Sequence, residues 1–281
     1  MTGKNKGISA YNRLRDLATT TKRNFQELLM YYAMERVLYR LSKSKYADRF
    51  VLKGALLLHS LDPSLARSTK DIDLLGRFDN SLDQIASIFR EICNIKTEDG
   101  LQLDEATIET LKIKEDAEYE GGRVSFIGHL GSARIPIQID IGFGDAVNPP
   151  PTEIEFPTLL NDPAPRLKGY PKETVVAEKL QALVQLQMLN SRIKDFYDLW
   201  FLLSHLEFDG ASLQKAIIET FKRRKTELEL EPVGLSESFA KDATKQAQWK
   251  AISGPTSPAS TLRECPSNQV GHRTVFRSHI Q

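Results

Sequence analysis

The sequence predicts an α/β (α+β) protein in which a small mixed sheet is preceded and followed by helices. Residues 135–141 alternate apolar and other side chains with the period of two that is typical of a strand. Residues 71–75 and the short apolar run 50–52 predict two more strands. Apolar residues before residue 45 and after residue 172 instead recur every three or four positions, which predicts helices.

The composition is that of an ordinary globular protein, with 281 residues, 41% hydrophobic and 27% charged. No apolar run is long enough to predict a transmembrane helix, and the first residues lack the apolar core of a signal peptide. Cys93 and Cys265 have no partner at the spacing of a zinc site. We therefore expect a cytoplasmic protein with free thiols and no membrane association.

Changes in composition divide the chain into five parts. Residues 146–171 contain seven of the thirteen prolines, which predicts an extended linker. After Trp249 the chain is rich in Ser, Thr, Pro and Gly without periodicity, which predicts disorder. The expected parts are basic N-terminal helices (1–45), a sheet-containing core (46–150), a Pro-rich linker (151–171), a helical domain (172–249) and a disordered tail (250–281).

Two carboxylates share one face of the strand at residues 71–75. Side chains alternate in a strand, so Asp71 and Asp73 point the same way, about 7 Å apart. Like charges held this close raise each other's pKa unless a cation compensates them. Mg²⁺ commonly binds one or two carboxylates together with substrate phosphates. The pattern therefore favours a metal site.

A glycine separates the first predicted strand from a short helix. Lys53 and Gly54 follow the apolar run 50–52, and Ala55 begins the helix. Free N–H groups at a helix N-terminus form a seat for phosphate, although a simple tight turn would have the same sequence. The Asp71–Asp73 pair, which begins seventeen residues after Gly54, favours the phosphate seat.

A third carboxylate follows from the strand at residues 135–141. Its isoleucines occupy one face, and Gln138 and Asp140 occupy the other. A solvent-exposed strand face would explain the pattern equally well. Asp145, in the loop that follows, is a weaker candidate for this third carboxylate.

The C-terminal helices place charges among apolar residues. Lys179 falls in the apolar stripe of the helix that begins at Lys172, where it either extends its ammonium group to solvent or acts on a substrate. Asp195 and Asp198 share a face of the next helix, where a buried acid needs a partner, and Lys179 or Arg192 could be that partner. Asp195 could instead cap the helix, and Asp198 could be a structural link.

The net charge of +1 conceals a basic N-terminal part. Residues 1–53 contain twelve Lys and Arg against four Asp and Glu. A solvated helical surface would explain this excess. A surface that contacts RNA phosphates or an acidic partner would explain it as well.

Five sequence blocks resemble the AbiEii/AbiGii toxin family of nucleotidyltransferases. In chain order they are FVLKGALLL, RSTKDIDLL, IDIGFGD, AEKLQAL and RIKDFYDL. The resemblance implies metal-dependent nucleotidyl transfer with Mg²⁺ or Mn²⁺ and an NTP substrate. It implies metal binding by Asp71, Asp73 and Asp140, with Lys179 and Asp195 as further catalytic residues. It also implies nucleotide binding by Lys53, Gly54, Ala55, Arg67, Ser68 and Arg192. The family usually has Gly or Ser where this chain has Ala55.

The resemblance also implies a biological role. AbiEii-like proteins are toxins of type IV toxin–antitoxin systems linked to abortive phage infection, and some transfer nucleotides to the acceptor end of tRNA. The expected partners are an NTP, tRNA or another RNA, and a separately encoded DNA-binding antitoxin that forms no stable complex with the toxin. A small-molecule transferase of the aminoglycoside-modifying type is an alternative function. A binding module with a decayed site is another.

Overall fold

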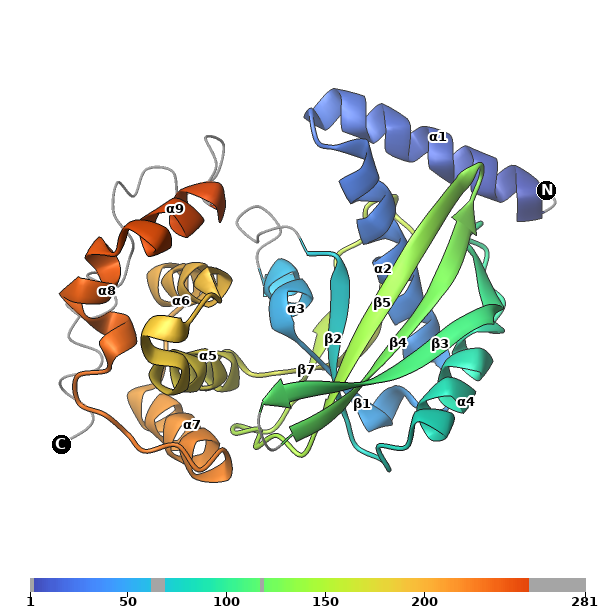
Figure 1. Ribbon diagram of the computed structural model, residues 1–281. Helices are drawn as coiled ribbons and strands as arrows, with labels where there is room; N and C mark the ends of the chain where they lie inside the picture. The colour runs from blue at the N-terminus through green and yellow to red at the C-terminus, as the bar shows by residue number, and fades with distance from the viewer. Residues whose placement is uncertain (1–2, 62–68, 117–118, 253–281) are drawn as a thin grey trace. The chain divides into compact units, whose positions relative to one another are not determined.

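The protein is described by a computed structural model that covers residues 3–61, 69–116 and 119–252. These residues form two compact units (Figure 1). Unit 1 comprises the described residues up to Gly144 together with Thr152–Gly169. Unit 2 comprises Asp145–Pro151 and the described residues from Tyr170 onward.

Unit 1 contains a seven-stranded mixed sheet with the order β3-β4-β5-β2-β1-β7-β6. The pairs β2–β5 and β1–β7 are parallel, and the other neighbouring strands are antiparallel. The strands are β1 (Phe50–Lys53), β2 (Asp71–Gly76), β3 (Gln102–Asp116), β4 (Tyr119–Leu130), β5 (Ala133–Phe143), β6 (Thr152–Glu155) and β7 (Arg166–Gly169). This arrangement confirms the predicted mixed α/β fold.

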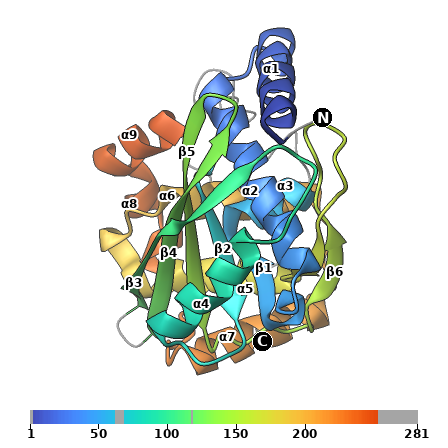
Figure 2. The same cartoon turned by 90° about the vertical axis from the view of Figure 1, so that its right-hand side faces the viewer.

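Four helices belong to unit 1. They are α1 (Gly3–Thr21), α2 (Phe25–Lys43), α3 (Gly54–Leu61) and α4 (Leu82–Cys93), with a 3₁₀ turn at Ala47–Arg49 before β1. α2 and α4 lie against one face of the sheet (Figures 1 and 2). Ile85 of α4 fits against Gly122 of β4, where an added Cβ would lie 2.4 Å from the isoleucine Cδ1. This helix-covered face is apolar, and the polar side chains of β2, β4 and β5 lie on the opposite face.

The segment 151–171 differs from its prediction as a linker. It contains β6 and β7, and β7 pairs in parallel with β1, so that the segment extends the sheet. Phe156, the residue that follows β6, is fully buried. All the prolines of this segment lie outside the two four-residue strands, in the stretches that flank and join them. A count of prolines could not reveal pairing with a distant strand.

Unit 2 is helical in its described part. Its helices are α5 (Lys172–Leu186), α6 (Ile193–His205), α7 (Gly210–Arg223), α8 (Glu237–Lys241) and α9 (Ala243–Ile252), with 3₁₀ turns at Gln187–Leu189 and Val233–Leu235. The predicted tail begins within α9, and from residue 253 onward it lies outside the described residues. Cys93 is a buried free thiol, and Cys265 also lies outside them.

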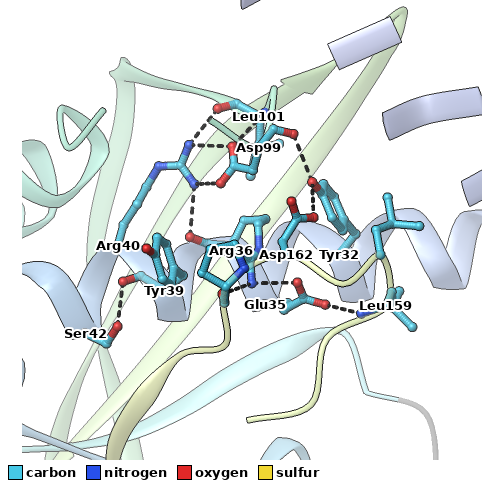
Figure 3. Close-up of polar contacts among 12 residues, drawn as sticks. Tyr32, Glu35, Arg36, Tyr39, Arg40, Ser42, Asp99, Leu101, Leu159 and Asp162 are labelled. Carbon is cyan, nitrogen blue, oxygen red and sulfur yellow. Dashed lines mark hydrogen bonds and ion pairs between the residues drawn. The ribbon is translucent and has the colours of Figure 1, made fainter. Parts of the chain in front are cut away.

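A buried polar network fixes α2 to the rest of unit 1 (Figure 3). Arg40 donates to both carboxylate oxygens of Asp99, at 2.8 and 3.0 Å, and to the carbonyl of Leu101 at 2.7 Å. Tyr32 donates to the carbonyl of Asp99 and to Asp162. The network therefore connects α2 to the turn that leads into β3 and to the segment that joins β6 to β7.

Glu35 belongs to the same helix and is fully buried. Its Oε2 accepts a hydrogen bond from the backbone N–H of Leu159 at 2.8 Å. Its Oε1 lies 2.7 Å from Nη2 of Arg36 without the geometry of a hydrogen bond, because adjacent helical residues do not face each other. Burial outweighs the attraction of Arg36 and raises the pKa of Glu35 to about 7.

This raised pKa predicts how stability depends on pH. The folded state binds more protons than the unfolded state between the ordinary glutamate pKa and about 7, so the free energy of unfolding falls as pH rises through this window. Glu35→Gln keeps an acceptor for Leu159 and cannot ionise. Relative to wild type, we expect the variant to gain stability from pH 4.5 to pH 7.5, by on the order of 3 kcal/mol.

Urea unfolding at a series of pH values measures this difference. Glu27→Gln is the matched control, because Glu27 lies in the first turn of the same helix with its side chain 38% exposed. Parallel stability profiles for wild type and Glu35→Gln would show that folding leaves the pKa of Glu35 unchanged, which contradicts the prediction.

Candidate active site

Two parallel strands bring the three predicted carboxylates to one face of the sheet in unit 1. In the β2–β5 pairing, Asp73 lies opposite Asp140, and Asp71 lies opposite Gln138. Paired residues in a sheet point to the same face, and so do residues two apart along one strand. All three aspartates are partly accessible to solvent, whereas Ile72 between the first two is fully buried. The face that carries these carboxylates is therefore the one opposite the helix-covered face.

The register continues on both sides of the aspartates. Lys53 of β1 pairs with Asp73, and Arg123 of β4 pairs with Asp140. Four adjacent strands thus place one residue each in a single line across the sheet. We call Lys53, Asp73, Asp140 and Arg123 the charged row. Two neighbouring anions in this row lie between two cations, which offsets the repulsion that two adjacent carboxylates would otherwise feel.

Arg123 is the residue of this site that sequence reasoning missed. Its Nε and Nη2 donate to the two oxygens of Asp140, each at 2.7 Å, which is a bidentate ion pair. The hydrogen bonds to Asp140, followed by the charges of Asp140, Asp71 and Asp73, raise the pKa of Arg123. A signal was present in the sequence. The sequence Gly131–Ser132 is typical of a turn between two strands, and a hairpin closed there pairs residue 123 with residue 140.

The glycine turn lies directly beside the carboxylates. Gly54 has φ +70°, a conformation that L side chains rarely adopt. A Cβ at this position would lie 2.0 Å from Oδ2 of Asp73. Glycine is therefore required both by the backbone and by the approach of the Asp73 carboxylate. Ala55 follows in the first turn of α3 and is buried.

Asp71 is held by the loop that precedes β2. Its Oδ1 accepts hydrogen bonds from the Thr69 hydroxyl at 3.2 Å and from the Lys70 backbone N–H at 3.1 Å. Arg67 and Ser68, which we predicted to contact the nucleotide, lie outside the described residues.

The donor set suits a divalent cation in part. Asp71 and Asp73 share a strand face and are partly exposed, which fits Mg²⁺ or Mn²⁺ bound by two carboxylates and substrate phosphates. Both oxygens of Asp140 are instead engaged by Arg123. Within the described residues, no group of three His, Cys, Asp or Glu side chains is arranged to hold a metal ion. The metal role of Asp140 stays a prediction, and the structure gives its oxygens a different partner.

Unit 2 contains the second group of predicted site residues. Nζ of Lys179 on α5 lies 2.8 Å from Asp195 Oδ1 and 2.8 Å from Asp198 Oδ2, both on α6. Nε of Arg192 lies 2.8 Å from the other oxygen of Asp195. The two possible partners of the buried aspartates are in place, since Lys179 and Arg192 both contact Asp195 and Lys179 also contacts Asp198. Asp198 is fully buried, and only 11% of the Lys179 side chain is exposed.

Asp145 has a structural setting within unit 2. Its carboxylate accepts a hydrogen bond from the Tyr170 hydroxyl at 3.0 Å and pairs with Arg224 of the residues that follow α7. Arg224 also contacts Glu178 and Gln181 on α5. These bonds connect the start of unit 2 to α5 and to the end of α7.

Comparison with known proteins identifies the family. The family model described as the nucleotidyl transferase AbiEii toxin of type IV toxin–antitoxin systems matches residues 36–268. The chain belongs to the AbiEii family. It is therefore a nucleotidyltransferase of the toxin class, as the sequence blocks predicted.

Two solved structures from Helicobacter pylori resemble this AbiEii-family chain. JHP933 is 20% identical, with a TM-score of 0.45, over 71% of this chain and 80% of that protein. A protein described as a candidate nucleotidyltransferase is 15% identical, with a TM-score of 0.49, over 90% of this chain and 94% of the other. No match was found among curated proteins. None of the helices in the described part of the chain is long and apolar enough to cross a membrane.

The Gly54 turn yields a test of the site. We expect Gly54→Ala to lower the free energy of unfolding by about 1–2 kcal/mol through its backbone conformation. It should also abolish nucleotidyl transfer, because the methyl group displaces the Asp73 carboxylate. Urea unfolding and a transfer assay measure the two effects.

Gly131→Ala provides the matched control for Gly54→Ala. Gly131 also has a positive φ, +58°, and lies in the turn between β4 and β5. This variant should lose similar stability and keep its activity. If Gly54→Ala transferred nucleotides as fast as Gly131→Ala and wild type, the result would show that the site tolerates displacement of Asp73.

The lysine cluster of unit 2 yields a second test. Lys179→Met leaves Asp198 buried without this cation and should lower the free energy of unfolding by about 3–5 kcal/mol. Lys179→Met/Asp198→Leu should recover most of the loss, because Asp195 keeps Arg192. Urea unfolding followed by tryptophan fluorescence reports on this unit. A wild-type value for Lys179→Met would show that the lysine has no structural role there.

Proposed function

We propose that the protein transfers a nucleoside monophosphate from an NTP to the 3′ end of an RNA, with tRNA as the acceptor, and releases pyrophosphate. The observation that supports this most is the charged row beside the Gly54 turn. It combines carboxylates that can hold a divalent cation with backbone N–H groups at the start of a helix, which can receive phosphate.

Each group of unit 1 would have a separate task. Asp71 and Asp73 would hold Mg²⁺ or Mn²⁺, which supplies charge neutralisation of the triphosphate when bound. The N–H groups at the start of α3, from Ala55 onward, would receive phosphate oxygens. Lys53, only 8% exposed and opposite Asp73, would add positive charge close to them. The hydroxyl that family members with serine have after the glycine is missing here, so phosphate binding rests on the backbone at this position.

Lys179 and Asp195 stay candidate catalytic residues of unit 2. The structure holds the Lys179 ammonium group between two carboxylates and so fixes its position on α5. Arg192 reaches Asp195 from the turn before α6 with half of its side chain exposed. An exposed guanidinium beside this cluster is suited to bind a phosphate of the nucleotide or of the acceptor.

An RNA acceptor is supported by the N-terminal helices, though by fewer residues than the sequence count suggests. Arg36 and Arg40 are buried in the network of α2, and Lys53 is buried in the charged row. Arg13, Arg15 and Lys22 of the first helix and its end are exposed. These are the exposed basic side chains of this segment that would contact RNA phosphates.

The biological role proposed is that of a toxin counteracted by a DNA-binding antitoxin that is encoded separately and forms no stable complex with it, in a system that limits phage infection. A cytoplasmic location is part of this proposal, since both the NTP and the tRNA are found there. An aminoglycoside-type acceptor is the alternative. The groups of unit 1 would bind the donor nucleotide and are compatible with either acceptor.

Label transfer tests the proposed function directly. The protein would be incubated with each α-³²P-labelled NTP, Mg²⁺ and total RNA, beside Asp71→Asn. We expect label on RNA of tRNA length with one or two of the nucleotides, and a loss of at least a hundredfold in the variant, because the carboxylate becomes a neutral amide.

Asp79→Asn is the matched control, since Asp79 follows β2, is exposed and caps the turn before α4. It should retain wild-type transfer. Label that appears on an aminoglycoside and not on RNA would assign the alternative acceptor. Absence of label on either acceptor from a folded protein would contradict nucleotidyl transfer by this chain.

A further inference from the structure

Arg123 and Asp140 form an ion pair at one end of the charged row. The guanidinium group has five N–H donors, and the bidentate pair with Asp140 uses two of them. The Asp140 side chain is 14% exposed and that of Arg123 is 36% exposed. The carboxylate is thus the more enclosed partner, and the guanidinium is the partner that a solvent-borne molecule can reach.

The position of Arg123 is set by the sheet. β4 and β5 form a hairpin whose register runs without interruption from Gly122 opposite Ile141 to Leu130 opposite Ala133. Arg123 is therefore placed on the same face as Asp73 and at a fixed distance along the row. The hydrogen bonds to Asp140 contribute most to the raised pKa of Arg123, and the negative charges of Asp140, Asp71 and Asp73 add to it.

An arginine in this position changes what Asp140 can do. A guanidinium does not lose its proton in proteins, so its charge stays with Asp140 under all ordinary conditions. A cation bound by Asp140 would have to displace a bidentate pair with two bonds of 2.7 Å. In the register of the sheet Asp73 lies opposite Lys53 of β1, and Asp71 accepts hydrogen bonds at Oδ1 from Thr69 and Lys70 of the preceding loop.

We propose that Arg123 binds a phosphate of the NTP and that Asp140 is the positioning residue that holds it, while Asp71 and Asp73 alone hold the metal. This inference rests on the proposed function. A bidentate carboxylate fixes the plane of the guanidinium and leaves donors directed away from it for phosphate oxygens. Arg123 and Lys53 then neutralise the triphosphate from the two ends of the charged row.

A second cross-strand ion pair on the same sheet provides a comparison with Arg123 and Asp140. Arg166 of β7 lies opposite Glu155 of β6, with Nε 2.9 Å from Oε2. Both side chains are more than half exposed, at 69% and 59%. This pair has the same chemistry and a similar antiparallel setting, but it lies outside the charged row. Arg166→Gln is therefore the matched control for Arg123→Gln.

The experiment measures binding of the full chain to the four α,β-methylene NTPs by calorimetry, as a function of Mn²⁺. These analogues resist transfer, so the readout does not depend on catalysis. The variants are Arg123→Gln, Arg123→Lys, Asp140→Asn, the double variant Arg123→Gln/Asp140→Asn, and Arg166→Gln. Asp71→Asn reports the loss of a metal ligand. Thermal unfolding of each variant identifies any loss of folding.

We expect Arg123→Gln to lower the affinity for the analogue tenfold to a hundredfold at saturating Mn²⁺. Asp140→Asn should lower it by a similar factor. The double variant should bind the analogue no more weakly than the single variant of lower affinity, because the two residues act as a unit. Arg123→Lys should restore part of the affinity, and Arg166→Gln should bind as wild type. Only Asp71→Asn should raise the Mn²⁺ concentration needed for half-maximal binding.

Two results would overturn the inference. Wild-type affinity of a folded Arg123→Gln protein would show that the pair is merely structural. A shift of the Mn²⁺ midpoint by Asp140→Asn as large as that by Asp71→Asn would make Asp140 a metal ligand. Failure of the wild-type protein to bind any analogue would overturn the proposed function together with this inference, and is distinguishable from both.

Discussion

The parallel pairing of β2 with β5 places Asp73 beside Asp140, and the chemistry of unit 1 depends on this contact. Two carboxylates in register on adjacent strands repel each other, so their neighbours must supply positive charge. β1 supplies Lys53 and β4 supplies Arg123. The order of the strands therefore decides the electrostatics of the site, since neither cation is close to the aspartates in the sequence.

The sequence predicted the parts of this site that depend on local pattern. Alternation placed Asp71 and Asp73 on one strand face and Asp140 on the polar face of another, and the positive φ of Gly54 fits the predicted turn. The pairing of Arg123 with Asp140 was missed although the hairpin turn at Gly131–Ser132 indicated it. The pairing of β2 with β5 is a non-local property that local pattern does not reveal. The same limit explains why residues 151–171 were interpreted as a linker, because β7 acquires its strand character from β1.

The two units stabilise buried charge in different ways. In unit 1, Arg40 satisfies both oxygens of Asp99 and a backbone carbonyl, and the resulting network anchors a helix to two loops. Glu35 has a backbone hydrogen bond at one oxygen and a poorly oriented cation, Arg36, at the other, and burial raises its pKa. In unit 2, one lysine serves two aspartates. The geometry of the contacts, more than the number of opposite charges, decides how well each buried group is compensated.

The hairpin of β4 and β5 closes at Leu130 opposite Ala133, seven residues from Arg123 or about 24 Å along the strand. A slip of one residue in this hairpin would turn Arg123 toward the helix-covered face, because strand side chains alternate. The length of the turn at Gly131–Ser132 therefore helps to determine whether Arg123 meets Asp140. Among relatives of this chain, insertions at that turn would be constrained by the site as strongly as substitutions within it.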